Sequence, residues 1–366
     1  MTQHMGNAVI LTNGKLDSEY AKTAHGLIRG TERFDVIAVI DPVHAGQDAG
    51  QVLDNIHRDI PIYPDLESCI SDRCCKPDVA VIGVAVIGGR LDEEWQQLAL
   101  SIVNQGISLV NGMHMFLGEI PAFQEAAKKS GARIIDIRRP KSLAQLSYWC
   151  GDIFEVTTPS IAVLGTDCAV GKRTTARFIR DACAEKQIRT EMIYTGQTGW
   201  LQGNRYGFVL DSTLNDFVSG EIEAAMVECA REAKPDLMVV EGQSALRNPM
   251  GPCGSEIIVS GNIKGVILQH APFRTHVDGM EKTGCLVPDL ETELKLVELY
   301  GSRVIAISLN GHGGTTDELL EYAKALEARI NTPVICPLEQ GMDRMTEVIQ
   351  SYLEAHPGLP DTSARG

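Results

Sequence analysis

The sequence predicts an α/β protein with two domains, each built on a parallel β-sheet. The chain has 366 residues, more than a single core usually serves. Short β-branched runs alternate with helical patterns, which is typical of βαβ units. In the second half, a glycine-rich loop stands between a strand pattern and a helix pattern. We expect a first domain over residues 1–150, a second over 151–355 and a flexible, Pro/Gly-rich tail at 356–366.

The first domain is expected to be Rossmann-like, with helices packed on a parallel sheet. The pattern at 92–105 places apolar residues on one helical face and stops before Gly106, a natural C-terminal glycine. Gly14 is a lone glycine after the first strand and does not complete a Gly-x-Gly-x-x-Gly fingerprint, so a nicotinamide site has little support. Strands are predicted at 8–11, 34–40, 79–86, 108–110 and 133–137.

The second domain is expected to be P-loop NTPase-like, with strands buried on both faces. Most of its strand patterns are continuous apolar runs, as expected for strands that helices cover on both sides. Thr315 and Glu318 form a capping-box pattern at the start of a helix over 317–330. Strands are predicted at 160–164, 189–194, 236–240, 265–269, 303–309 and 333–336.

Charge and hydropathy exclude several classes of partner. The net charge of −15 repels both a phosphate backbone and an anionic membrane surface. The apolar runs fall short of the roughly 20 residues that cross a bilayer, and the N-terminus lacks a basic segment followed by an apolar stretch. We therefore expect a cytoplasmic protein with small-molecule substrates and no nucleic-acid or membrane partner. Two-domain metabolic enzymes commonly form closed assemblies, so a homo-oligomer is expected.

Cysteine usage predicts reduced thiols and no metal site. The ten cysteines are scattered, and none of them form a Cys-x-x-Cys pair.

The loop from Gly165 to Thr175 predicts a phosphate-binding site. It follows the strand at 160–164 and leads into an amphipathic helix, which is the context that a P-loop requires. Backbone N–H groups of such a loop surround an anion, the helix N-terminus adds partial positive charge, and Lys172 supplies a mobile cation. The expected cofactor-binding residues are Gly165, Thr166, Asp167, Gly171, Lys172, Arg173, Thr174 and Thr175.

Two features of this loop depart from an ordinary P-loop. Five residues instead of four separate Gly165 from Gly171, and Arg173 replaces the hydroxyl residue that normally binds magnesium after the lysine. Thr174 or Thr175 would approach a metal from a different helical direction, since each residue turns the helix by roughly 100°. The loop therefore favours a phosphate-rich ligand held without hydrolysis.

Three side chains near strand ends are candidate catalytic groups. Glu241 follows four apolar residues, at the carboxyl end of a strand where open α/β sheets bind ligands. It would hold magnesium through water in a nucleotidase, accept a proton from an ammonium substrate in an acetyl transfer, or simply cap the next loop. Asp167 has the same alternatives of metal and amine binding, and His270 is either catalytic or structural.

The same strand ends suggest substrate-binding residues. The segment 195–199, which includes Gln197 and Thr198, contains two glycines and two hydroxyls, a pattern suited either to close backbone approach by a ligand or to a plain turn. Arg274 follows His270 by four residues, and a guanidinium is the natural partner of a substrate carboxylate.

These motifs resemble known families. The start Gly165-Thr166-Asp167 and the spacing to Lys172 resemble the P-loop of dethiobiotin synthetases. Glu241-Gly242 resembles the acidic strand end of the same enzymes. The wider pattern is similar to a P-loop family of formerly unknown function, which includes a D-glutamate N-acetyltransferase of D-amino-acid catabolism that uses acetyl-CoA. This pattern comprises 165–175, 195–199, 211–212, 216–218, 241–243, 269–272 and Arg274. Gln243, which lies within it, is assigned to substrate binding as well.

The resemblance implies an acetyl-CoA-dependent N-acetyltransferase (an acyltransferase) that acts on a D-amino acid such as D-glutamate. The dethiobiotin-synthetase likeness implies an alternative, an ATP-dependent ligase or kinase of a small carboxylic acid with ATP and magnesium. A third hypothesis is a nucleotide-binding regulator without chemistry. Arg173 at the magnesium position argues against the second.

Overall fold

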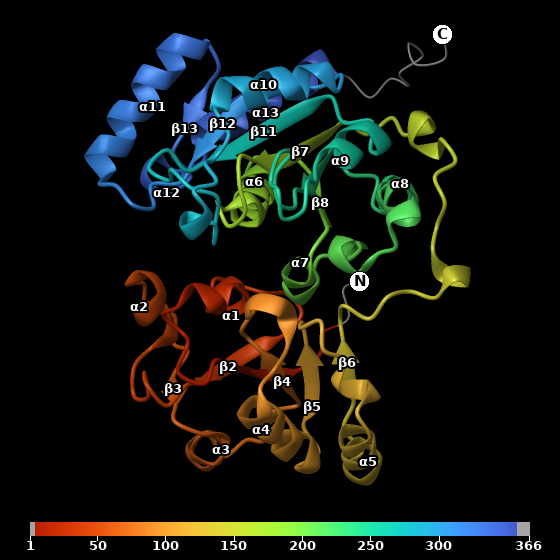
Figure 1. The fold of residues 1–366 in the computed structure, drawn as a ribbon, viewed down its shortest axis with the longest axis vertical. Coiled ribbons are helices and arrows are strands. Elements are labelled where there is room, and N and C mark those ends of the chain that lie inside the picture. Colours follow the sequence, from red (N-terminus) through yellow and green to blue (C-terminus); the bar gives the residue numbers. More distant parts are fainter. Residues whose placement is uncertain (1–3, 357–366) are drawn as a thin grey trace. The chain divides into compact units, whose positions relative to one another are not determined.

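The computed structural model describes residues 4–356 and divides into two units (Figure 1). Unit 1 contains the described residues up to Pro140 together with Gln197–Arg205, and unit 2 contains Lys141–Gly196 and the described residues from Tyr206 onward. Each unit is built on a parallel sheet, so the predicted fold class is confirmed. The tail predicted at 356–366 lies outside the described residues except for His356.

Unit 1 has a six-stranded sheet in the order β3-β2-β1-β4-β5-β6, and all of its pairs are parallel. Successive residues of β1 alternate between two apolar cores, since Val9 and Leu11 lie in one and Ala8 and Ile10 in the other. This order reverses direction at β1, as in doubly wound nucleotide-binding folds. The strands are Asn7–Leu11 (β1), Asp35–Ile40 (β2), Ile62–Tyr63 (β3), Val79–Ile82 (β4), Ser108–Asn111 (β5) and Ile134–Asp136 (β6).

Helices cover both faces of this sheet. The helix predicted at 92–105 is confirmed as α4: Asp92 caps it by accepting a hydrogen bond from Trp95 N at 3.0 Å, and Gly106 follows it with φ +74°. The α-helices are Lys22–Ile28 (α1), Ala49–Asp54 (α2), Leu66–Arg73 (α3), Glu93–Asn104 (α4) and Pro121–Ser130 (α5), and 3₁₀ turns span Glu19–Ala21, Ile87–Gly89 and Leu117–Glu119.

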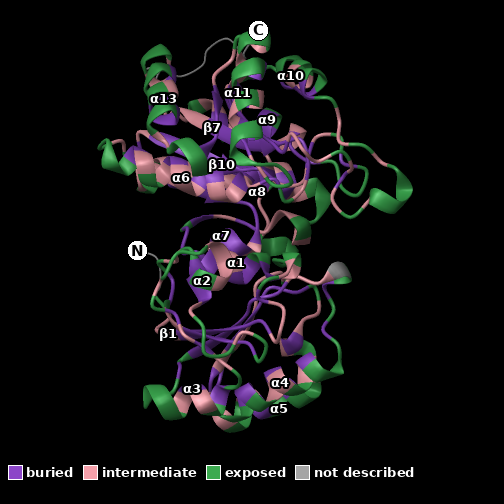
Figure 2. Cartoon of the chain, turned by 90° about the vertical axis from the view of Figure 1, so that its left-hand side faces the viewer, coloured by how far each residue is buried: buried purple, intermediate pink, exposed green. Residues whose placement is uncertain are grey.

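Unit 2 has a seven-stranded parallel sheet in the order β13-β12-β11-β7-β10-β8-β9. Its strands are buried between helices whose outer faces are exposed (Figure 2). In this order the central strand β7 lies between β11 and β10. Because the strands are parallel, the loops after these three strands meet at one edge of the sheet. The strands are Ser160–Gly165 (β7), Thr190–Tyr194 (β8), Tyr206–Gly207 (β9), Leu237–Glu241 (β10), Gly265–His270 (β11), Arg303–Leu309 (β12) and Val334–Ile335 (β13).

The helices of unit 2 include the one predicted at 317–330, which is α11. Thr315 and Glu318 form the expected capping box, in which Thr315 Oγ1 accepts from Glu318 N at 3.3 Å. The α-helices are Lys172–Glu185 (α6), Asn215–Glu232 (α8), Ser255–Ser260 (α9), Leu290–Leu299 (α10), Thr316–Ile330 (α11), Pro337–Gln340 (α12) and Asp343–Ala355 (α13), and 3₁₀ turns span Leu143–Gln145, Asp152–Glu155, Leu210–Ser212 and Glu281–Thr283.

Two segments belong to the other unit than the predicted domains 1–150 and 151–355 would place them in. Residues 141–150 belong to unit 2 because two buried carboxylates of α8 bind them. Glu221 accepts from Lys141 Nζ at 2.6 Å and from Ser147 N at 2.8 Å, and Glu223 accepts from Cys150 N at 2.7 Å. Conversely, Gln197–Arg205 belongs to unit 1, where the short helix Gln197–Leu201 (α7) adds Leu201 to the core.

All ten cysteines are free thiols. Within residues 4–356, no helix is both long enough and apolar enough to cross a membrane.

Candidate functional site

The glycine loop between β7 and α6 has the backbone geometry of an anion cradle. β7 ends at Gly165 and α6 begins at Lys172, with Gly171 as N-cap at φ +108°. A Cβ at Gly165 would lie 2.9 Å from Val170 Cγ2, so only glycine fits there. Gly171 has no side chain to cap α6, and a helix N-terminus directly after a glycine loop is the place where phosphates bind in nucleotide-binding folds.

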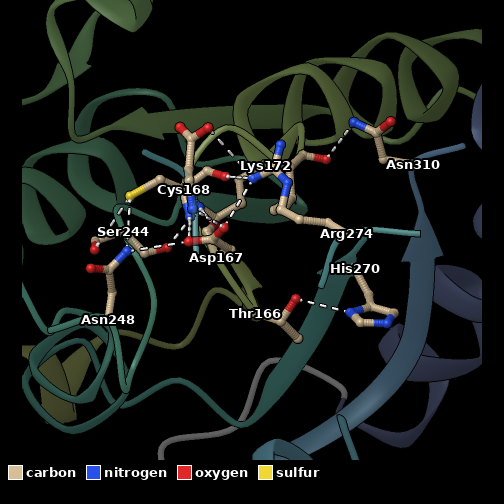
Figure 3. Close-up of polar contacts among 11 residues, drawn as sticks. Thr166, Asp167, Cys168, Lys172, Ser244, Asn248, His270, Arg274 and Asn310 are labelled. Atoms are coloured by element: carbon tan, nitrogen blue, oxygen red, sulfur yellow. Dashed lines mark hydrogen bonds and ion pairs between the residues drawn. The ribbon is translucent and has the colours of Figure 1, made fainter. Parts of the chain in front are cut away.

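Lys172 is buried at the centre of this loop (Figure 3). Its Nζ donates to the carbonyl oxygens of Asp167 at 2.6 Å and Ser244 at 2.7 Å. Burial lowers the pKa of Lys172, against the opposing effect of Cys168 and Asp167. A phosphate oxygen would provide this ammonium group with an anionic acceptor instead of two neutral carbonyls.

The carboxylate of Asp167 is fully buried and is bound on both oxygens. Oδ1 accepts from Cys168 N at 2.7 Å and from Asn248 Nδ2 at 3.2 Å, while Oδ2 accepts from Arg274 Nη1 at 3.0 Å and Asp278 N at 2.8 Å. Arg274 Nη1 also donates to Cys168 O at 2.7 Å. Asp167, a candidate catalytic carboxylate, and Arg274, a candidate substrate-binding residue, thus bind each other, which favours a role in fixing the loop.

The hydroxyl groups of the loop face β11. Thr166 Oγ1 lies 2.9 Å from His270 Nδ1, and Thr175 Oγ1 donates to Gln269 Oε1 at 2.6 Å. The Thr175 hydroxyl is therefore bound to the sheet, in line with the expectation that it need not point toward a metal, and Thr174 is half-buried. Within the described residues, no group of three or more His, Cys, Asp or Glu side chains has the arrangement of a metal site.

Glu241 ends β10, between β7 and β8, and is buried. Its Oε2 accepts from Thr195 N at 3.1 Å, and its carbonyl oxygen accepts from Thr195 Oγ1 at 2.8 Å. Burial raises the pKa of the Glu241 carboxyl, and the positive charges of Arg173 and Lys172 counteract this effect. A buried carboxyl that is less acidic than usual and lies near two cations is suited to proton transfer.

The four predicted substrate-binding residues are divided between the units. Arg274 lies beside the loop, and Gln243 Nε2 donates to Thr195 Oγ1 at 3.1 Å, so both belong to unit 2. Gln197 and Thr198 belong to unit 1: Gln197 Oε1 accepts from Arg138 Nη2 at 2.9 Å, and the Thr198 hydroxyl lies 3.5 Å from that of Thr23.

Sequence reasoning did not identify Ser244 and Asn248, which shape the loop together with Asn310. Ser244 and Asn248, from the loop after β10, bind Lys172 and Asp167, and Asn310 Nδ2 donates to Val170 O at 3.0 Å (Figure 3). Asn310 directly follows an apolar strand, which was the available signal. Ser244 and Asn248 have no comparable pattern, because their partners lie more than 70 positions away in the chain.

The buried His270 is expected to make the free energy of unfolding smaller at acid pH. Burial lowers its pKa to about 4, below the ordinary 6.5, so the unfolded chain binds the additional proton between these values. The free energy of unfolding should fall as the pH falls from 6.5 to 4, by about 3 kcal/mol in total. In His270→Gln this loss should disappear from urea-unfolding midpoints measured across that range. The control, exposed His312→Gln, should retain it; an unchanged pH dependence in His270→Gln would contradict the assignment.

The fold and the cradle define a two-domain protein with a Rossmann-like unit and a P-loop unit. The chain belongs to the DUF1611 family, as expected from its motifs: residues 147–346 match the P-loop domain, described as a domain of unknown function, and residues 42–140 match the Rossmann-like N-terminal domain. The chain is also similar to the crystal structure of a DUF1611 family protein from Anabaena variabilis, with a TM-score of 0.85 and 26% identity, covering 94% of this chain and 99% of that one.

Two curated relatives have a named activity. A D-glutamate N-acetyltransferase of Tritonibacter scottomollicae is 28% identical over 277 residues, which is 74% of this chain and 80% of the relative. A protein of the same name from a Pseudoalteromonas species is 28% identical over 270 residues, 72% of this chain and 78% of the relative. These names support an N-acetyltransferase interpretation of the family site.

Proposed function

We propose that this protein is an acetyl-CoA-dependent N-acetyltransferase whose acceptor is a D-amino acid such as D-glutamate. The observation that carries the proposal is the pairing of a phosphate cradle, which contains Lys172 and Arg173, with a buried carboxyl at Glu241. The acceptor and the transferred acetyl group are suggested by the names of the curated relatives, and CoA is proposed as the carrier because its phosphates suit the cradle.

In this account the cradle binds a phosphate group of CoA. The phosphate replaces the carbonyls of Asp167 and Ser244 as acceptor for Lys172 Nζ and lies against the first turn of α6. The Asp167–Arg274 pair fixes the loop backbone, so the rearrangement on binding is confined to the Lys172 side chain.

Glu241 then serves as the base. It removes a proton from the ammonium group of the acceptor, and the neutral amine attacks the thioester carbon. The C–N bond forms and the C–S bond breaks, and the proton that the nitrogen must lose to become an amide passes to the departing thiolate of CoA, while Glu241 keeps the proton that it took from the ammonium group. Because the pantetheine arm separates the thioester from the phosphates, the account requires this arm to fold back toward the end of β10.

An ATP-dependent ligase or kinase is the second candidate, and the P-loop itself favours it. Two features weigh against it: Arg173 occupies the position of the usual magnesium-binding hydroxyl, and the Thr175 hydroxyl binds Gln269. A regulator that only binds nucleotide would need no buried proton acceptor at Glu241.

A thermal-shift panel separates these functions without a guess at the acceptor. Acetyl-CoA at 100 times its dissociation constant should stabilise the protein by about 2.7 kcal/mol, and ATP with magnesium or NAD should have a much smaller effect. The acetyl-CoA shift should be lost in Lys172→Ala. Stabilisation by ATP with magnesium but not by acetyl-CoA would overturn the proposal in favour of the ligase.

A further inference from the structure

Unit 2 contains a cavity of about 460 Å³ at the edge of its sheet where the strands begin. The residues that precede β7 form one side of this cavity, and those that precede β11 form another. Met226 of α8 and the last turn of α13 complete the lining. The phosphate loop follows the other end of β7, so the cavity and the loop lie at opposite edges of the sheet. Its volume is within the range of about 300–1,000 Å³ that is typical of ligand pockets.

Part of the cavity wall is apolar and is held in place by contacts within unit 2. Ile153, Met226 and Tyr352 line the cavity and are buried. The Tyr352 hydroxyl donates to Ser160 O at 2.9 Å, and the Tyr352 ring stacks on the ring of His356 with 4.3 Å between the centroids. Because these contacts fix the wall before a ligand binds, an apolar group can bury its surface there with little ordering cost.

Uncharged polar side chains also line the cavity. They belong to Thr157 and Thr158, which precede β7, and to Asn262, which precedes β11. Within the part of the chain that the structure describes, none of these three side chains forms a hydrogen bond or an ion pair. Hydroxyl and amide groups both donate and accept hydrogen bonds, so they can bind the polar end of a ligand.

The charge of the lining determines the sign of the ligand. Lys264 lines the cavity and is half-buried, and no described residue of the lining is an Asp or Glu. The chain as a whole has a net charge of −15, so this cavity differs from the average surface of the protein. Burial raises the pKa of Tyr352 to about 12, so its hydroxyl is neutral at pH 7 and adds no negative charge. An anionic group would therefore be attracted by Lys264 and would meet no carboxylate in the lining.

We propose that this cavity binds a small carboxylic acid with an apolar, aliphatic or aromatic body. The carboxylate interacts with the Lys264 ammonium group and accepts hydrogen bonds from the Thr157, Thr158 and Asn262 side chains. The apolar body packs against the wall that includes Tyr352. Since the phosphate loop lies at the other edge of the sheet, this acid is an additional ligand and not a substrate of the loop. The proposal does not depend on the proposed acetyl transfer.

The test is the binding of 4-phenylbutyrate to the full chain, measured by isothermal titration calorimetry. Two further probes separate the parts of the ligand: 4-phenylbutan-1-ol has the same body without the charge, and acetate has the charge without the body. We expect 4-phenylbutyrate to bind at one site and each of the other probes to bind roughly 10-fold more weakly or less, because each lacks one of the two interactions. Absence of 4-phenylbutyrate binding, or equal affinity for the acid and the alcohol, would overturn the proposal.

Variants of the lining show whether the probe lies in the cavity. Lys264→Gln should weaken the binding of 4-phenylbutyrate roughly 10-fold, whereas the exposed Lys295→Gln of α10, outside the lining, should not. Ala355→Trp should fill the cavity and abolish binding, and Glu354→Trp, next to it and outside the lining, is the matched control. Ala355 is exposed, so this variant is expected to fold even if Lys264→Gln does not. Wild-type affinity in Ala355→Trp would refute the proposed location.

Two further measurements distinguish this cavity from other places where the probe could bind. Lys172→Ala should bind 4-phenylbutyrate as the wild type does, because Lys172 lies at the other edge of the sheet. Loss of binding in this variant would place the probe in the phosphate loop and contradict the proposal. A chain that ends at His356 tests whether residues 357–366 compete for the cavity, and binding by the shortened chain alone would also contradict it. Absence of acetyl transfer would refute the proposed function and leave these expectations unchanged.

Discussion

Replacing Glu241 with glutamine is expected to lower kcat for acetyl transfer from acetyl-CoA to D-glutamate by roughly 100-fold or more. Glutamine keeps the shape of the side chain and cannot accept a proton. Because burial raises the pKa of Glu241 above its ordinary value of 4.5, wild-type activity should fall as the pH drops through that raised pKa. The acid limb should be absent from the residual activity of Glu241→Gln. Initial rates of CoA release between pH 4.5 and 8 measure both effects.

The control for this variant is Glu185→Gln, an exposed carboxylate at the last residue of α6, which should behave as the wild type. If Glu241 is instead a magnesium ligand, the wild-type reaction should require metal and EDTA should abolish it. Full turnover by Glu241→Gln would exclude Glu241 as the base.

Replacing Lys172 with alanine is expected to raise KM for acetyl-CoA by roughly 10- to 100-fold. The variant removes a charged donor to phosphate, an interaction of about 1.5–3 kcal/mol, and leaves the acceptor chemistry unchanged. Steady-state kinetics with varied acetyl-CoA separate KM from kcat. A fall in kcat with no change in KM would show that Lys172 acts on the reacting acetyl group and not on a phosphate.

Lys186→Ala is the matched control for the Lys172 variant. Lys186 lies at the C-terminal end of the same helix and is exposed, so its removal should leave KM unchanged. A comparable rise in KM for both variants would indicate a general electrostatic effect of the acidic protein instead of a specific phosphate contact.

Local sequence patterns predicted most of the fold because they report local physics. Continuous apolar runs predicted β7, β10 and β11, the glycine spacing predicted the loop before α6, and Thr315 with Glu318 predicted the start of α11. The two-residue strands β3 and β9 were not predicted, because two residues are too few to establish a period; β13 is equally short but was predicted as part of the segment 333–336.

Contacts between distant residues were beyond these patterns. The sequence placed Asp167 and Arg274 correctly near strand ends but did not predict that they bind each other across 107 positions. The sequence analysis also assigned residues 197–205 to the second domain. Their place in unit 1 depends on Leu201 packing into a core formed by distant residues, which no local pattern reports. The sequence thus predicted that Asp167, Glu241 and His270 lie near the ends of the unit 2 strands, but not that Gln197 and Thr198 belong to unit 1.

The central claim, transfer of an acetyl group from acetyl-CoA to an amino group, is tested most directly with the wild-type protein. Acetyl-CoA and D-glutamate are incubated with the protein, with and without EDTA, and N-acetylglutamate and free CoA are quantified together. The account predicts equal amounts of both products, no formation without the protein, and no effect of EDTA. Absence of N-acetylglutamate would contradict the account, and metal-dependent ATP turnover in a parallel incubation with ATP and magnesium would then support the ligase.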